Sequence, residues 1–82
     1  MAHNGAPSPT DLLSRITSNP AICGGRPCVR GMRTRVTDVI DLLAAGLTAS
    51  EVVQELPDLE PDDVLACLQF ASRRLDHPTF VN

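Results

Sequence analysis

The chain has 82 residues, a formal net charge of −3 at pH 7 and only 2% aromatic residues. This length excludes more than one domain, and the scarcity of aromatic rings means that a core must be built mainly from aliphatic side chains. No stretch is apolar over the ~20 residues of a membrane span, so no membrane association is expected. The first ten residues lack the basic and apolar regions of a secretory signal, and the three cysteines are an odd number. We therefore expect reduced thiols and a cytoplasmic protein.

The seven basic residues are all arginines, and they are unevenly placed along the chain. Residues 12–35 carry five arginines and no acid, whereas residues 36–82 carry nine acids against Arg73 and Arg74. Such an asymmetry indicates a charged partner at the basic end. A solvated surface with self-complementary charge would give the same pattern.

The ends of the chain and the segment before the helices are predicted to be irregular. Residues 1–10 are small, polar and proline-containing, and together with residues 77–82 they are predicted as disordered tails of a single domain at 11–76. Residues 11–16 fit either a short helical turn or a strand that leads into the domain. Prolines and glycines interrupt residues 15–36, which we call the arm, too densely for a long helix.

Two extended pieces fit between the turns of the arm. Residues 27–30 and 33–36 are predicted to form a short β-hairpin that turns at Gly31 and Met32. Glycine adopts positive φ without a steric penalty, so the glycines of the arm indicate turns rather than a loop that cradles phosphate. The arm residues assigned to turn geometry are Gly24, Gly25, Pro27 and Gly31.

After the arm the apolar pattern becomes helical. It predicts three helices, at about residues 37–45, 48–56 and 61–75. Thr37 is expected to cap the first helix, and Thr48 with Glu51 has the spacing of a capping box at the second. Pro57 closes the second helix, and Pro61 suits the first turn of the third, where its missing N–H costs nothing.

Each predicted helix carries an apolar stripe that is expected to face the core. The first stripe consists of Val36, Ile40, Leu43 and Leu47, and the second of Ala49, Val52, Val53 and Leu56. The third consists of Val64, Leu68, Ala71 and Leu75, and is widened by Leu65, Cys67 and Phe70. Three helices with short connections predict a compact right-angled bundle, in which the second and third have helix-turn-helix spacing.

The arm and the first two helices also carry a specific pattern of glycine, proline and arginine. Its residues are Arg15, Ile16, Pro20, Gly24, Gly25, Pro27, Gly31, Arg33, Val36, Leu42, Ala45, Gly46 and Thr48, and the third helix adds Pro61, Asp63, Val64, Ala66 and Ala71. In these positions the chain resembles the bacterial family called domain of unknown function 433, over about residues 13–75. It departs from many members at Met32 and Arg35, where the arm gains charge without a change in fold.

The resemblance implies a mainly α fold, a three-helix homeodomain-like helix-turn-helix bundle with a short N-terminal β-hairpin or arm. It also implies the antitoxin half of a toxin–antitoxin pair, which binds and neutralises a PIN-like nuclease toxin. Binding of its own promoter DNA is a further expectation. The alternatives are a stand-alone helix-turn-helix transcription regulator and a protein-interaction module that does not bind DNA.

The arginines of the arm are the candidate partner-binding residues. They are Arg26, Arg30, Arg33 and Arg35. Arginines on an extended element can contact DNA phosphates or enter a minor groove, and they can equally bind carboxylates of a protein partner. A solvated edge guarded by charge is the third interpretation. The edge of the predicted hairpin could also pair with a second copy, so a homodimer is expected.

The third predicted helix is a poor candidate for reading DNA. Its first turn, which contacts bases in helix-turn-helix proteins, carries Glu60, Asp62 and Asp63. Carboxylates are repelled by phosphates and weaken the electrostatic part of DNA binding. We therefore interpret these acids as capping groups of a structural helix.

Neither a metal site nor an active site is expected, and no cofactor. Cys23 and Cys28 form one C-x4-C pair, and Cys67 is expected to be a small core residue, whereas a structural zinc site requires four ligands. His3 and His77 lie in the predicted tails, so no nucleophile–base pair lies on ordered elements.

Overall fold

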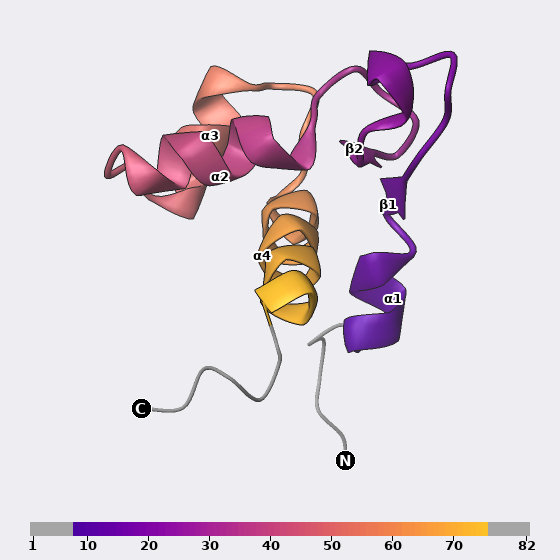
Figure 1. Cartoon of the computed structure of the whole chain (residues 1–82). Helices are drawn as coiled ribbons and strands as arrows, with labels where there is room; N and C mark the ends of the chain where they lie inside the picture. Colours follow the sequence, from indigo (N-terminus) through magenta and orange to yellow (C-terminus); the bar gives the residue numbers. More distant parts are fainter. Residues whose placement is uncertain (1–7, 76–82) are drawn as a thin grey trace.

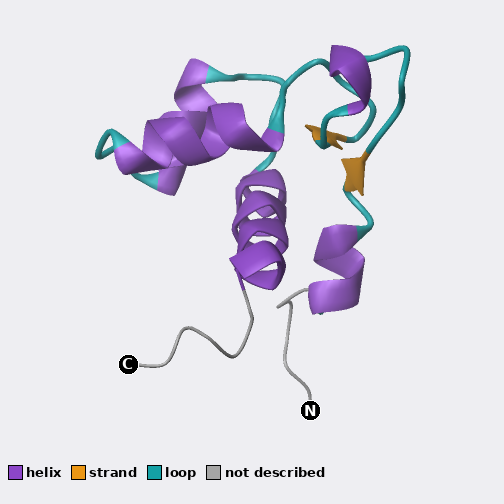
Figure 2. Ribbon diagram, in the orientation of Figure 1, coloured by secondary structure: helices purple, strands orange, loops and turns teal. Residues whose placement is uncertain are grey.

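A computed structural model describes residues 8–75, and within them it contains four α-helices and a short two-stranded antiparallel sheet (Figure 1). The predicted mainly helical class, with a little β-structure ahead of the main helices, is thus confirmed (Figure 2). The predicted tail at 77–82 and most of the one at 1–10 lie outside the described residues. No helix in the described range is long and apolar enough to cross a membrane.

The elements follow one another with short connections. In chain order they are α1 (Pro9–Leu13), β1 (Ile16–Thr17), a 3-10 turn (Cys23–Gly25), β2 (Cys28–Val29), α2 (Val36–Ala44), α3 (Ala49–Glu55) and α4 (Pro61–Leu75). The three predicted helices correspond to α2, α3 and α4, and none of their ends is shifted by more than one residue.

Helix α1 begins inside the segment that was predicted as a tail. The Ser8 hydroxyl accepts a hydrogen bond from the Asp11 amide at 3.1 Å and so caps the helix, and Pro9 occupies its first turn. Leu12 is buried, and α1 packs against α4. The sequence left a short helical turn and a strand open for residues 11–16, and the structure has the helix up to Leu13 and the strand from Ile16.

The sheet has a different partner strand from the one predicted. Strand β2 pairs with β1, with Ile16 opposite Val29. The predicted partner, residues 33–36, makes a single bridge on the other side of β2, where the Val29 amide donates to the Thr34 carbonyl at 2.9 Å. Both edges of β2 are therefore occupied, which leaves it unavailable for strand pairing with a second copy.

The helix caps were predicted correctly for α3 and wrongly for α2. At α3, the Thr48 hydroxyl accepts from the Glu51 amide at 3.1 Å and the Glu51 carboxylate accepts from the Thr48 amide at 2.8 Å, which confirms the capping box. At α2, Thr37 lies inside the helix and is not the cap. There the Asp38 carboxylate accepts from the Arg35 amide at 2.9 Å.

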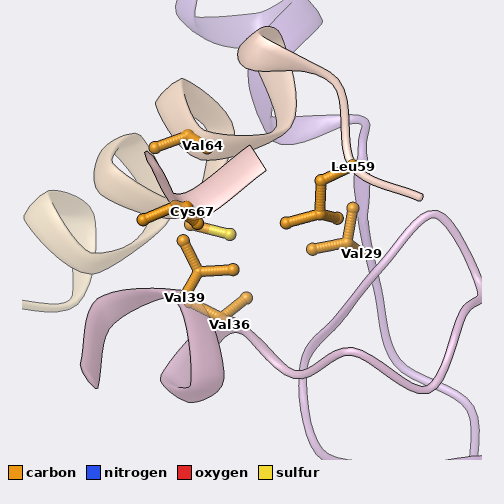
Figure 3. Packing of buried hydrophobic residues seen from close by; sticks show 7 residues of the cluster. Val29, Val36, Val39, Leu59, Val64 and Cys67 are labelled. Atoms are coloured by element: carbon orange, nitrogen blue, oxygen red, sulfur yellow. The ribbon is translucent and has the colours of Figure 1, made fainter. Parts of the chain in front are cut away.

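Helices α2 and α3 lie side by side across the N-terminal end of α4, which runs away from them (Figure 1). The hydrophobic core forms where these helices meet β2. Its buried residues are Val29, Val36, Val39, Val52, Leu59, Val64 and Cys67. Leu59, from the connection between α3 and α4, lies beside Val29 of the arm (Figure 3). The core thus joins the arm to the helices.

The buried face of α4 differs from the predicted stripe. Asp63, Val64, Ala66 and Cys67 are buried. Three predicted core residues are exposed instead: Leu65 by 42%, Leu68 by 44% and Leu75 by 61%. The buried face of the helix thus includes Asp63, whose carboxylate pairs with two arginines of the arm.

Candidate functional site

A buried carboxylate joins the arm to the first turn of α4. Asp63 is fully buried and accepts hydrogen bonds from Arg30 Nη2 at 2.8 Å and from Arg15 Nη1 at 2.9 Å. The amide of Glu60 donates to the same carboxylate at 2.7 Å. The predicted capping role of the acids is thus seen at Asp63, and the two charge-assisted pairs hold the arm in place.

The arginines also pair with the rest of this acidic turn. Arg15 lies 2.9 Å from Glu60 Oε1 and 3.7 Å from Asp62 Oδ2, and Arg30 donates to the Asp58 carbonyl at 3.0 Å. Sequence reasoning did not select Arg15 as a site residue. The sequence does contain a signal for its role, because the arm is basic and the first turn of α4 is acidic. This is the self-complementary charge pattern that was one of the two interpretations of the sequence.

The pKa of Asp63 reflects the balance between burial and these partners. Burial raises the pKa, but the hydrogen bonds from Arg30, from the Glu60 amide and from Arg15 outweigh it and hold the pKa below its ordinary value. The pKa of Arg15 is raised, first by its hydrogen bond to Glu60, and that of Arg30 by its bond to Asp63. All three groups are therefore charged at neutral pH.

The four candidate arginines fall into two pairs. Arg30 and Arg35 are used within the chain, Arg30 at Asp63 and Arg35 at Asp38, where Nη2 and Oδ1 are 3.1 Å apart. Arg26 and Arg33 are exposed, and within the described residues neither has an ion-pair partner. Of the four candidate arginines, Arg26 and Arg33 are therefore the two that remain free to meet a partner.

The glycines assigned to turns all have positive φ: +63° at Gly24, +82° at Gly25 and +72° at Gly31. At Gly25, an added Cβ would lie 3.7 Å from the Pro20 Cα, an ordinary contact, so the backbone angle and not the space requires glycine there. The Pro27 carbonyl accepts from the Val36 amide at 3.0 Å. These turns set the path of the arm.

The arm also brings two thiols together. Cys23 is half-buried and donates to the Arg33 carbonyl at 3.1 Å, whereas Cys28 is buried on β2. Burial, then the hydrogen bond with Cys23, raises the pKa of Cys28 to about 11. Burial raises the pKa of Cys67 to about 12, and its buried position confirms the predicted core role. In the described range no group of three or more histidine, cysteine or acidic side chains is placed to hold a metal ion.

A groove of about 400 Å³ opens between α2 and the C-terminal half of α4. Its apolar lining comes from three parts of the chain, namely Pro27 of the arm, Val36 and Ile40 of α2, and Phe70, Ala71 and Leu75 of α4. Arg26 and Arg74 also line it, as does Asp41, and the Arg74 guanidinium lies 5.2 Å from the Phe70 ring centroid. An apolar hollow with arginines in its lining suits an apolar side chain that is flanked by carboxylates.

These features define a class of small helical domain in which a glycine-rich arm is held against the last helix by buried ion pairs. Residues 16–71 match the family described as Protein of unknown function (DUF433), so the chain belongs to this family and the resemblance of its arm is confirmed. The chain is also similar to "Uncharacterized protein y4eO" of Sinorhizobium fredii (strain NBRC 101917 / NGR234), with 39% identity over 49 residues. That match covers 60% of this chain and 22% of the relative, so the chain spans about a fifth of the relative's length. No solved structure matches the chain.

Proposed function

We propose that this chain is an antitoxin-like binding protein that holds a PIN-like nuclease toxin and neutralises it. The observation that carries the binding part is the apolar groove between α2 and α4, with Arg26 and Arg74 among its lining residues. The choice of toxin rests on the resemblance of the arm to its family. The fold in this proposal is a homeodomain-like helix-turn-helix, with α3 and α4 as the helix pair.

Two features favour a protein partner over DNA at α4. The acids of its first turn are already paired with Arg15 and Arg30, so this turn presents neutralised carboxylates instead of base-reading donors. The groove, in contrast, is lined mainly by aliphatic and aromatic groups, as the centres of protein interfaces are.

The test is growth rescue. The reading frame beside this gene is expected to encode a nuclease that stops growth when expressed alone, and co-expression of this chain should restore growth. Arg26→Glu should weaken the rescue, because it reverses a charge in the groove. Arg33→Glu is the matched control, since it makes the same charge change at an exposed arginine of the arm outside the groove lining. A non-toxic neighbour, or equal rescue by both variants, would contradict the proposal.

A second candidate function is DNA binding through the arm. Two exposed arginines without ion-pair partners in the described range, Arg26 and Arg33, favour contacts with phosphates. Fluorescence anisotropy with DNA from upstream of the gene should then give a Kd that rises steeply with salt, and both Arg26→Glu and Arg33→Glu should weaken binding. No binding at low salt would rule out this function.

A further inference from the structure

Two of the three cysteines meet in the arm, and the proposed binding function uses neither. Cys23 begins the 3-10 turn and Cys28 lies on β2, with four residues between them. The turn reverses the chain, because the Gly25 amide donates to the Ile22 carbonyl at 3.0 Å and the Arg26 amide to the Cys23 carbonyl at 3.2 Å. The two thiols are thereby brought into hydrogen-bond contact.

The backbone at Cys23 indicates that its side chain has a role. Its φ is +53°, in the left-handed region where a side chain crowds its own backbone and glycine is favoured. Gly24 and Gly25, which follow it, adopt the same region without this cost. Cys23 is held there by its thiol, which donates to the Arg33 carbonyl at 3.1 Å. Strained positions of this kind cluster at functional sites.

The two thiols of the arm differ in their access to solvent. Cys23 is half-buried, whereas Cys28 is only 2% exposed. Burial, then the hydrogen bond with Cys23, raises the pKa of Cys28 to about 11, so Cys28 is a protonated thiol at neutral pH. An oxidant in solution therefore meets Cys23 first. Cys67 is fully buried in the core between the helices and is shielded from such an oxidant.

We propose that Cys23 and Cys28 form a redox switch of the arm, in which a peroxide converts the two thiols into an intrachain disulfide and a thiol reductant reverses the change. The Cys23 sulfur attacks one oxygen of hydrogen peroxide, the O–O bond breaks, and the thiol proton leaves with the other oxygen as water. The Cys28 sulfur then attacks the resulting sulfenic acid, the S–O bond breaks, and the hydroxyl group leaves with the Cys28 proton as water. Together the sulfurs lose the two electrons that reduce the peroxide.

The disulfide changes the arm in two ways. It consumes the Cys23 thiol proton, so the Arg33 carbonyl loses its hydrogen-bond donor. It also draws the two sulfurs from hydrogen-bond contact to a bond length of about 2.05 Å, which moves the loop between them. This loop carries Arg26 and Pro27, which line the groove between α2 and α4. Oxidation of the arm therefore acts on the groove, whereas formation of the disulfide does not depend on toxin binding.

The first test is peptide mass mapping of the full chain after treatment with hydrogen peroxide, alkylation of free thiols under denaturing conditions, and digestion with trypsin. Trypsin cleaves after arginine but not before proline, so residues 16–30 form one peptide with Cys23 and Cys28, and Cys67 lies in residues 36–73. Peptide 16–30 should carry no alkyl group and be lighter than its reduced form by two hydrogen atoms, while Cys67 is alkylated. Dithiothreitol should restore two alkylation sites. A peptide 16–30 that keeps two free thiols, or that gains oxygen atoms instead, would overturn the proposal.

Variants separate the roles of the three thiols. Cys67→Ala is the matched control and should form the disulfide as the unchanged chain does. Cys28→Ser should leave Cys23 as a sulfenic acid, which dimedone captures. Cys23→Ser should lower the oxidation rate of the thiol in peptide 16–30 by about tenfold or more, because only the buried Cys28 remains. This last result does not require the Cys28→Ser variant to fold. An unchanged rate in Cys23→Ser would show that Cys23 is not the first thiol to react and would contradict the proposal.

The second test measures the effect on the arm by amide NMR spectra of the reduced and the oxidised chain. The signals of Arg26 and Thr34 should shift, because the first lies in the closed loop and the second follows the Arg33 carbonyl. The signals of α3 should stay in place. Unchanged signals at Arg26 and Thr34 would mean that the disulfide does not act on the arm, and the switch would be wrong. Both tests use the chain alone, so they can fail while the growth rescue succeeds, and the reverse.

Discussion

Asp63→Ala is expected to lower the free energy of unfolding by about 3–4 kcal/mol, a large part of the stability of a small domain. The substitution leaves the Arg15 and Arg30 guanidiniums without their buried partner and removes the acceptor of the Glu60 amide. Both arginines are partly exposed and can turn to water, which places the loss near the lower end of the range for broken buried pairs. Urea unfolding followed by circular dichroism measures the effect.

The neighbouring acid provides the control for this prediction. Asp62 is 45% exposed at its side chain and lies 3.7 Å from Arg15. Exposed ion pairs contribute little, so Asp62→Ala should cost less than about 1 kcal/mol. Equal losses from Asp62→Ala and Asp63→Ala would mean that the buried ion pairs do not hold the arm.

The same carboxylate gives stability a pH dependence of defined sign. The folded-state pKa values of Asp63 and Asp38 are lowered, that of Asp38 first by the hydrogen bond from the Arg35 amide. Their stabilising effect is therefore complete above the unfolded-state pKa of about 4 and is lost as the pH falls toward the folded-state value. Asp63→Asn should weaken this acid dependence, whereas an unchanged profile would exclude Asp63 as its source.

Leu59→Ala is expected to cost about 2–4 kcal/mol, through lost burial and the cavity left behind. Leu59 is 3% exposed and contributes to the core beside Val29, so its loss loosens the contact between the arm and the helices (Figure 3). The measurement is again urea unfolding. Leu56→Ala is the matched comparison, because Leu56 is only half-buried although the helical pattern favours it as the core residue. A larger loss from Leu56→Ala would contradict the packing described above.

Local signals in the sequence predicted the helices well. The capping box of Thr48 and Glu51 and the proline at position 61 act through neighbouring residues, so the ends of α3 and α4 could be predicted to within one residue. The glycines of the arm could likewise be assigned to turns, because the freedom to adopt positive φ belongs to the single residue.

Features that depend on distant residues could not be predicted. The burial of Asp63 on α4 is accompanied by ion pairs with Arg30 and Arg15, which lie 33 and 48 positions earlier in the chain, and helical periodicity carries no information about such pairs. Strand β2 pairs with β1 at Ile16, across the loop that separates the two strands in the chain. The sequence pattern suggested the nearer residues 33–36 as its partner.

The candidate site illustrates the same limit. Sequence reasoning selected four arginines of the arm as equals, and the structure divides them, since Arg30 and Arg35 bind Asp63 and Asp38 of the same chain. The groove could not be predicted, because it forms only where the arm, α2 and α4 meet. Sequence identifies the charges, but the fold decides which of them remain available to a partner.

The most direct test of the proposed binding surface is a calorimetric titration of the neighbouring nuclease with the Arg26→Glu and Arg33→Glu variants. Binding in the groove predicts a Kd about tenfold or more above that of the unchanged chain for Arg26→Glu, and an unchanged Kd for Arg33→Glu. Weakening by Arg33→Glu with an unchanged Kd for Arg26→Glu would contradict the proposal, because the partner would then contact the arm at Arg33, outside the groove.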